Sequence, residues 1–111
     1  MQKLLPLAFS LCVLSSPAKA EFVDGNTLLS RINGNDIEQF HALGYITGVV
    51  DALMGSVICP PPNITARQVN DMVLSFLKAS PGVRHKSADA IVSHVTSLAW
   101  PCETKKKGTG T

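Results

Sequence analysis

The chain has 111 residues, of which 45% are apolar and 5% aromatic, with 10 lysine and arginine residues against 8 aspartate and glutamate residues. This length allows one domain and excludes a two-domain enzyme with a cofactor-binding fold of its own. Two of the cations, Lys3 and Lys19, precede residue 21, so the remainder has no net charge. A neutral chain without a basic stripe is a poor candidate for binding nucleic acid.

Residues 1–20 have the three parts of a secretory signal peptide. Lys3 gives a positive start, an apolar segment runs from Leu4 to Leu14, and Ala18-Lys19-Ala20 has the small-residue pattern of a cleavage site. The apolar segment is shorter than the roughly 20 residues that a helix needs to cross a bilayer. We therefore predict that the chain is exported and that the mature protein begins at Glu21.

Two cysteines, Cys59 and Cys102, remain after removal of the signal peptide. In an exported protein an even pair of cysteines most simply forms a disulfide, and two cysteines allow one connectivity. The loop-entropy model assigns such a bridge about 4 kcal/mol of stabilisation. A redox or metal-binding pair is the alternative, but the CxxC spacing that is typical of it is absent. The sequence predicts a structural bridge.

The apolar residues recur at helical spacing, and the alternation typical of strands is absent. A short first helix is predicted from about Thr27 to Ile32, with Asn26 as its N-cap. A longer second helix is predicted to begin after Asn35, which makes a capping box with Glu38. We expect this helix to continue to about Val57, shortly before a run of three prolines.

Two more helices are predicted after the prolines. The third begins after Thr65, which pairs with Gln68 in a second capping box, and ends at Ser80-Pro81-Gly82. Its apolar stripe consists of Val69, Met72, Val73, Phe76 and Leu77. The fourth runs from about Ser87 to Ala99, and Pro101 ends it. The side chains that it is expected to bury are Ala88, Ile91, Val95 and Leu98.

These elements predict an all-α fold, a compact bundle of about four helices with one disulfide, formed by residues 21–102. Residues 103–111 contain a lysine run and end in glycine and threonine. A short polar segment of this kind is expected to be a disordered tail.

The predicted second helix contains Gly44, Gly48 and Ala52 at intervals of four residues. Each glycine disfavours a helix by about 1 kcal/mol relative to alanine, and a flat surface that lets another helix approach closely would compensate. That partner is either another helix of the chain or the same helix of a second subunit. Asp51 lies within the apolar segment, which argues against a transmembrane helix. We expect a buried central helix in which a loop amide or Arg84 pairs with Asp51.

The sequence lacks the usual signatures of an active site. No HExxH, GxSxG or phosphate-binding loop occurs in it. His94 is placed at the core-facing edge of the fourth helix and is expected to be half-buried and structural, while His85 is a capping or contact residue in a loop. We predict that the protein is not an enzyme and that it holds no cofactor or metal.

Residues 44–52, Gly44-Tyr45-Ile46-Thr47-Gly48-Val49-Val50-Asp51-Ala52, resemble the G-Y-x-x-G-x-x-D-A signature of the Tai-type immunity proteins of the Rap/Tai family. Shorter matches follow in the same order, among them Cys59-Pro60, Arg84-His85 and Trp100-Pro101-Cys102. The resemblance extends over about Phe22 to Cys102. In one respect the chain differs from the family, because a second cysteine pair that many relatives carry is missing here.

Proteins of this family are periplasmic antidotes to peptidoglycan amidases that type VI secretion delivers. The resemblance therefore implies a Gram-negative host, a periplasmic location and a protein partner, an amidase whose substrate groove the chain would occlude. It also implies a homodimer. The residues of the signature, expected to be mainly structural, are Gly44, Tyr45, Gly48, Asp51 and Ala52.

One loop is the first choice for the surface that faces the amidase, because it combines a rigid turn with Arg and His. Its residues are Pro81, Gly82, Val83, Arg84 and His85. The loop at residues 60–63 is the second choice. Both loops also have a simpler interpretation as connections between helices.

Two other functions fit the same general features. A small periplasmic acid-stress chaperone is also exported, helical and held by one disulfide, but such chaperones are highly charged, and only 16% of this chain consists of Asp, Glu, Lys and Arg. A general periplasmic scaffold without a toxin partner is the third hypothesis. The signature at residues 44–52 favours the immunity protein.

Overall fold

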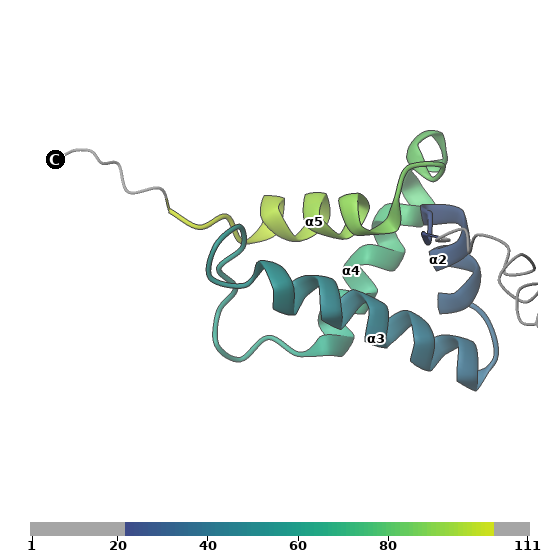
Figure 1. The fold of residues 1–111 in the computed structure, drawn as a ribbon, viewed down its shortest axis with the longest axis horizontal. Coiled ribbons are helices and arrows are strands. Elements are labelled where there is room, and N and C mark those ends of the chain that lie inside the picture. The colour runs from purple at the N-terminus through teal and green to yellow at the C-terminus, as the bar shows by residue number, and fades with distance from the viewer. Residues whose placement is uncertain (1–21, 104–111) are drawn as a thin grey trace, which may run out of the picture.

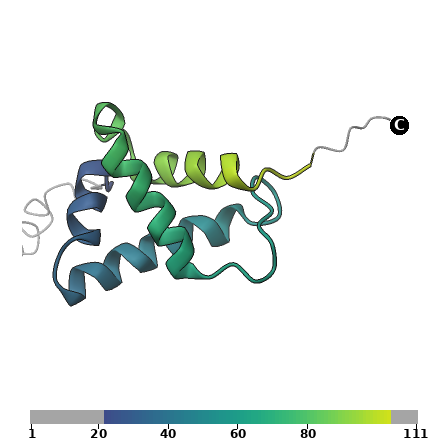
Figure 2. The same cartoon turned by 180° about the vertical axis from the view of Figure 1, so that it is seen from behind.

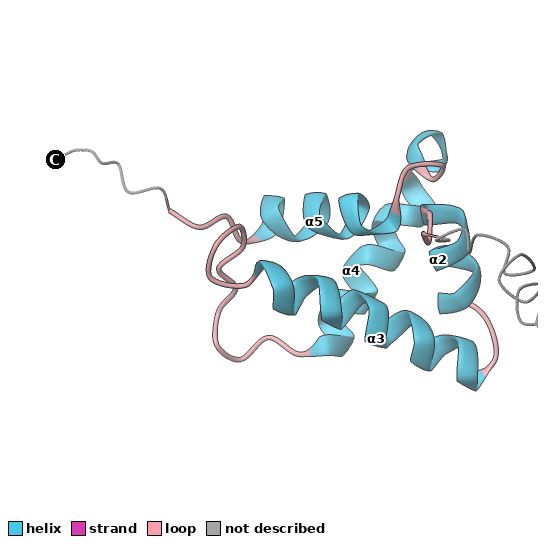
Figure 3. Ribbon diagram, in the orientation of Figure 1, coloured by secondary structure: helices cyan, strands magenta, loops and turns pink. Residues whose placement is uncertain are grey.

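The computed structural model describes residues 22–103. In this part of the chain the helices are α2 (Gly25–Ile32), α3 (Asp36–Leu53), α4 (Ala66–Ala79) and α5 (Ala88–Ala99), with a short 3-10 helix, η1 (Pro81–Val83), before α5. Residues 22–103 contain no β-strand, so the predicted all-α class is confirmed (Figure 3). The predicted signal peptide, residues 1–20, and residues 104–111 of the predicted tail lie outside the described residues.

The helices are arranged around one core. α3 and α5 lie side by side, α4 crosses one face of this pair, and α2 lies across one end (Figures 1 and 2). The largest fully buried side chains are Leu28, Ile46, Ile58, Leu77, Val73, Val92 and Thr96. Within residues 22–103, no helix is long and apolar enough to cross a membrane.

Two helices begin at the capping boxes that the sequence predicts. The pair before α3 is Asn35 with Glu38, and the pair before α4 is Thr65 with Gln68. In each box the two side chains accept hydrogen bonds from backbone N–H groups that the helix leaves without a partner. The predicted apolar stripe of α4 faces the core. Its buried members are Val69, Val73 and Leu77, and its partly buried members are Met72 and Phe76.

The N-cap of α2 differs from the prediction. The carboxylate of Asp24 accepts a hydrogen bond from the backbone N–H of Thr27 at 2.8 Å, so α2 begins at Gly25 and Asn26 already lies inside it. A carboxylate at this position also interacts favourably with the positive end of the helix dipole. The hydrogen bonds from Thr27 hold the pKa of Asp24 below its ordinary value.

α3 ends at Leu53 and not at Val57 as predicted. Met54 is extended, and Gly55 has a φ of +88°, a conformation that glycine adopts readily and other residues do not. The Gly55 N–H donates a hydrogen bond to the carbonyl of Ile58 at 2.8 Å, and this turn places Ile58 in the core. The glycine turn, and not the prolines that follow, therefore ends the helix.

α3 is buried on one face only, so the prediction of a buried central helix is wrong. Its buried side chains are Ala42, Ile46 and Val50. On other faces, Ile37 is 69% exposed and Phe40 is 73% exposed. Asp51 is exposed as well, and because water solvates its carboxylate, it does not need the predicted pairing with a loop amide or Arg84.

α5 buries a partly different face from the one that the sequence predicts. The side chains buried as expected are Ala88, Ile91 and Val95. In contrast, Leu98 is 70% exposed, while Thr96 is fully buried. The Thr96 hydroxyl donates a hydrogen bond to the carbonyl of Val92 at 2.8 Å, which satisfies this polar group inside the core.

Cys59 and Cys102 form the predicted disulfide, with their Cα atoms 4.8 Å apart. The bridge joins the segment after α3 to the segment after α5. Beside it, the backbone N–H of Cys59 donates a hydrogen bond to the carbonyl of Trp100 at 2.8 Å. Ile58 and Pro101 also form an isolated antiparallel bridge. The disulfide and the backbone hold together the two segments that follow α3 and α5.

Candidate functional site

The loop that the sequence selects as a partner surface, residues 81–85, is a series of tight turns. Pro81 starts η1, and the N–H groups of Val83 and Arg84 donate hydrogen bonds to the carbonyls of Ser80 and Pro81 at 3.2 and 3.4 Å. Pro81, Gly82 and His85 are exposed, whereas Val83 and Arg84 are partly buried. The loop therefore presents a mixed apolar and basic surface.

This loop is fixed to the start of α2. The N–H groups of Gly25 and Asn26 donate hydrogen bonds to the carbonyls of Lys86 and Arg84, both at 2.9 Å, and the N–H of Ala88 donates to the carbonyl of Val23 at 2.8 Å. The first N–H groups of a helix have no partner within it. Here the carbonyls of Arg84 and Lys86 are the partners for α2, so these hydrogen bonds tie the end of the loop to the helix.

Gly25 is the residue that allows this close approach, and its replacement by alanine gives a first prediction. A Cβ atom at this position would lie 2.6 Å from Cδ1 of Ile91 and 2.8 Å from the carbonyl oxygen of Arg84. Because Ile91 is buried and the oxygen belongs to the backbone, neither atom moves freely. We expect Gly25→Ala to lower the free energy of unfolding by about 1–3 kcal/mol in urea titrations.

Gly82→Ala is the matched control for this prediction. Gly82 is exposed, and a Cβ atom there would meet nothing within 4 Å. The control is expected to change the free energy of unfolding by less than about 0.5 kcal/mol. Equal stability of the two variants would show that α2 and the loop are not in tight contact.

A pocket of about 270 Å³ lies beside the loop, between α4 and α5. We call it the loop pocket, and its lining residues are Phe76, Val83, Lys86, Ala90, Ile91 and His94. The rings of Phe76 and His94 contact one another with centroids 5.5 Å apart. His94 is exposed, so its predicted half-buried position is wrong. Instead of serving the core, it lines this pocket.

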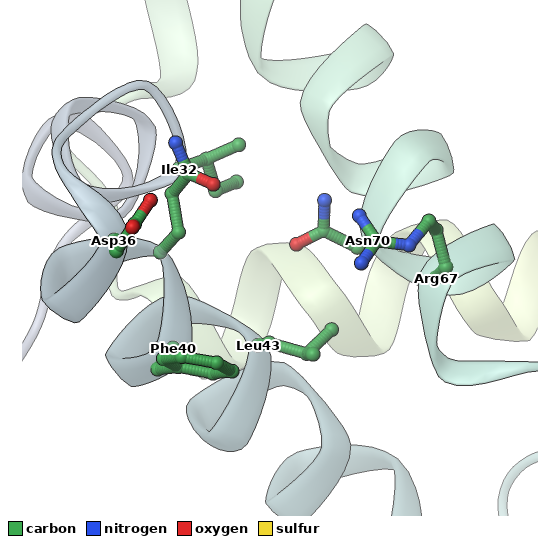
Figure 4. Close-up of a pocket in the computed structure, with 7 residues that line it drawn as sticks. Ile32, Asp36, Phe40, Leu43, Arg67 and Asn70 are labelled. Atoms are coloured by element: carbon green, nitrogen blue, oxygen red, sulfur yellow. The ribbon is translucent and has the colours of Figure 1, made fainter.

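A second pocket, of about 320 Å³, lies between the N-terminal halves of α3 and α4. Its lining residues are Ile32, Asp36, Gln39, Phe40, Leu43, Arg67 and Asn70. Asp36 lies on one side of it, and Arg67 and Asn70 lie on the opposite side (Figure 4). We call it the mixed-charge pocket, because both a carboxylate and a guanidinium line it.

The signature residues on α3 differ in their surroundings. The four small or acidic residues are exposed, namely Gly44, Gly48, Asp51 and Ala52. A Cβ atom at Gly44 or Gly48 would meet nothing within 4 Å, so no other helix of the described part of the chain covers this face. Tyr45 is partly buried, and its burial, together with the negative charge of Asp89, raises the pKa of its phenol.

Sequence reasoning missed several residues of these surfaces. Lys86 directly follows the basic pair Arg84-His85, so the sequence alone could have added it to the predicted partner surface. The approach of Gly25 to Ile91 and the meeting of Phe76 with His94 join residues far apart in the chain, and no local pattern reveals such contacts. Within residues 22–103, no group of three or more His, Cys, Asp or Glu side chains is placed to hold a metal ion.

Comparison with known proteins assigns the chain to a family. A search of curated proteins found no match. The family model for Rap1a immunity proteins matches residues 24–102, which begin at the N-cap of α2, include all of the helices described above and end at the second cysteine. The chain therefore belongs to the Rap1a immunity proteins, a family of inhibitors, not enzymes, that protect against type VI secretion effectors.

Proposed function

We propose that this protein is exported through a cleaved signal peptide at residues 1–20 and that in the periplasm it binds a type VI secreted peptidoglycan amidase. It blocks the amidase by inserting the loop at residues 81–85 into the substrate groove. The observation that carries this proposal is the set of backbone hydrogen bonds by which α2 holds the loop and the residue that follows it.

Occlusion of a groove favours a surface that is ordered before binding. A loop that is flexible in the free protein loses conformational entropy when it binds, and this loss reduces affinity. The hydrogen bonds of Gly25 and Asn26 to the segment around residues 84–86 reduce that loss. The basic residues of the segment, Arg84 and Lys86, also speed the encounter with an acidic partner surface.

A bulky residue at the tip of the loop tests this proposal. Gly82→Trp adds a side chain where a Cβ atom meets nothing, so the fold is expected to persist. We expect the variant to weaken inhibition of the amidase by about a hundredfold, since the indole would prevent the loop from fitting the groove. The measurement is protection of cells that express the amidase in their periplasm, together with its inhibition in extracts.

Ser75→Trp is the control, because Ser75 is exposed on α4 and lies outside both pockets and the loop. It should protect cells as well as the wild type does. Full protection by Gly82→Trp would contradict the proposed role of the loop. Loss of protection by Asn63→Trp alone would assign the interface to residues 60–63 instead.

The exposed face of α3 supports a homodimer as part of this proposal. Ile37, Phe40, Gly44 and Gly48 follow one another at helical spacing, and all four are exposed. The glycines allow an identical helix to approach closely, and the bulky apolar side chains of Ile37 and Phe40 would pack against it. Such a contact would also bury the apolar surface that the single chain leaves in water.

Gly48→Leu is expected to convert the dimer to a monomer, because its side chain would occupy the space that the second helix needs. Sedimentation velocity of the wild type, of Gly48→Leu and of the exposed α4 control Ser75→Leu measures this directly. The wild type and the control should sediment as dimers. A wild type that is monomeric at all concentrations tested, or a dimeric Gly48→Leu variant, would contradict the proposal.

A further inference from the structure

The loop pocket combines an apolar floor with a basic rim. Phe76, Val83 and Ile91 contribute apolar surface, while Lys86, which follows the loop, and His94 of α5 bring nitrogen-containing side chains. Its volume of about 270 Å³ is below the range of about 300–1,000 Å³ that is typical of sites for small-molecule ligands. The pocket is therefore large enough to hold one side chain of a protein segment, with the neighbouring residues of that segment close to its opening.

The ionisable side chains that line this pocket are Lys86 and His94. No carboxylate belongs to the residues that line it. Two carboxylates close to this segment are outside the lining: Asp24, which forms an isolated bridge with Ser87, caps α2 through Thr27, and the Oδ1 atom of Asp89 accepts a hydrogen bond from the N–H of Ala90 at 2.9 Å. The rim is therefore complementary to a negatively charged group.

We propose that the loop pocket binds an apolar side chain of the effector that stands beside a carboxylate, with the apolar group on the floor and the carboxylate against Lys86 and His94. This inference rests on the proposed function and specifies the chemistry of the segment that the effector presents. The chain's own lysine run, Lys105 to Lys107, has the same charge sign as the rim and is not a suitable occupant.

The mixed-charge pocket does not have this selectivity. Asp36 and Arg67 lie on its opposite sides (Figure 4), so it offers attraction and repulsion to a charged group of either sign. It serves as an internal reference, because a segment that binds by apolar contact alone would enter both pockets. We expect acidic segments to prefer the loop pocket to the mixed-charge pocket.

The first experiment uses blocked tripeptides and the isotope-labelled protein purified from the periplasm. The probes are Ac-Glu-Leu-Glu-NH₂, its neutral analogue Ac-Gln-Leu-Gln-NH₂ and its basic analogue Ac-Lys-Leu-Lys-NH₂. Amide signals of Val83, Lys86 and Ala90 are expected to shift with the acidic peptide, which should bind about tenfold or more tightly than the basic one. In Lys86→Glu this preference should disappear or reverse.

The second experiment measures affinity for the amidase. Lys86→Glu and the pocket-filling variant Ala90→Trp are each expected to weaken binding by about tenfold or more. Ala99→Trp, at an exposed position at the end of α5 and outside the pocket, should bind as the wild type does. Circular dichroism and thermal unfolding of each variant establish that it is folded before its affinity is compared.

The two experiments separate this inference from the proposed function. If the wild type binds the amidase and both pocket variants bind it equally well, the pocket assignment is wrong and the immunity function stands. If the wild type does not bind any amidase, the proposed function fails, and the peptides still decide the chemistry of the pocket. Equal shifts by all three peptides, or shifts only around Asp36 and Arg67, would overturn the inference.

Discussion

Replacement of both Cys59 and Cys102 by serine is expected to lower the free energy of unfolding by about 4 kcal/mol. The bridge spans 43 positions of the chain, and its loss lets the unfolded state explore many more conformations. Domains of this size have total stabilities of about 5–15 kcal/mol. The loss would therefore remove a large share of the total stability, so the fold depends on conditions that keep the disulfide oxidised.

Urea unfolding followed by far-UV circular dichroism measures this effect. The reduced wild-type protein is the control, because it lacks the bridge but keeps both cysteines, and it should lose about as much stability as the double serine variant. A double variant within about 1 kcal/mol of the oxidised wild type would show that the backbone contacts of Cys59 with Trp100 and of Ile58 with Pro101 hold this end of the bundle without the bridge.

Ile46→Ala is expected to destabilise the fold by about 2–5 kcal/mol. Ile46 is fully buried on α3, and alanine there would leave a cavity among the side chains that the other helices contribute to the core. Ile37→Ala is the matched control, because it makes the same chemical change on the same helix. Since Ile37 is 69% exposed in the single chain, the control should cost less than about 1 kcal/mol when the protein is monomeric.

The pair of variants tests the orientation of α3 about its axis. Thermal and urea unfolding of both variants, compared at a concentration where the oligomeric state is known, give the two changes in stability. Equal losses would contradict the assignment of the inner and outer faces. A larger loss for Ile37→Ala would indicate that the Ile37 face is the more deeply buried one in the assembled protein.

Local sequence signals predicted the fold class well. The capping boxes at Asn35 and Thr65 were found because cap and partner are three residues apart, so the pattern is complete within one turn. The end of α4 at Ser80 and the pairing of Cys59 with Cys102 followed from equally simple rules. The capping boxes and the end of α4 depend on residues that are close together in the chain, and two cysteines allow only one pairing.

The inner face of α3 could not be predicted in the same way. Apolar residues occur all around this helix, so their spacing does not indicate which side faces the core. Ile37 and Phe40 suit the interior as well as Ile46 does, and only the positions of the other helices decide between them. The early end of α3 has a different cause, because the turn at Gly55 competes with continuation of the helix.

The burial of Thr96 in place of Leu98 has a specific reason. A threonine is usually assigned to the surface, but its hydroxyl can donate to a carbonyl one turn back, as Thr96 does to Val92. With that bond the side chain has no unsatisfied donor and enters the core. The spacing of apolar residues does not reveal this hydrogen bond, so it predicts burial of the more apolar Leu98.

The candidate site is less predictable because its parts come from different helices. The loop at residues 81–85 was chosen from its own composition, and its role as the effector-facing surface remains a prediction. The loop pocket needs Phe76 of α4 to meet His94 of α5, and its basic rim becomes visible only when these helices are packed. Membership of an immunity family favours an inhibitor over the acid-stress chaperone with which the sequence is also compatible.

Groove occlusion is tested by titrating a purified type VI peptidoglycan amidase with the protein while the hydrolysis of peptidoglycan is followed. An immunity protein that occludes the substrate groove should abolish activity at close to one equivalent per amidase, and Gly82→Trp should require a large excess. An amidase that remains fully active at a saturating concentration of the wild-type protein would contradict the proposed inhibition.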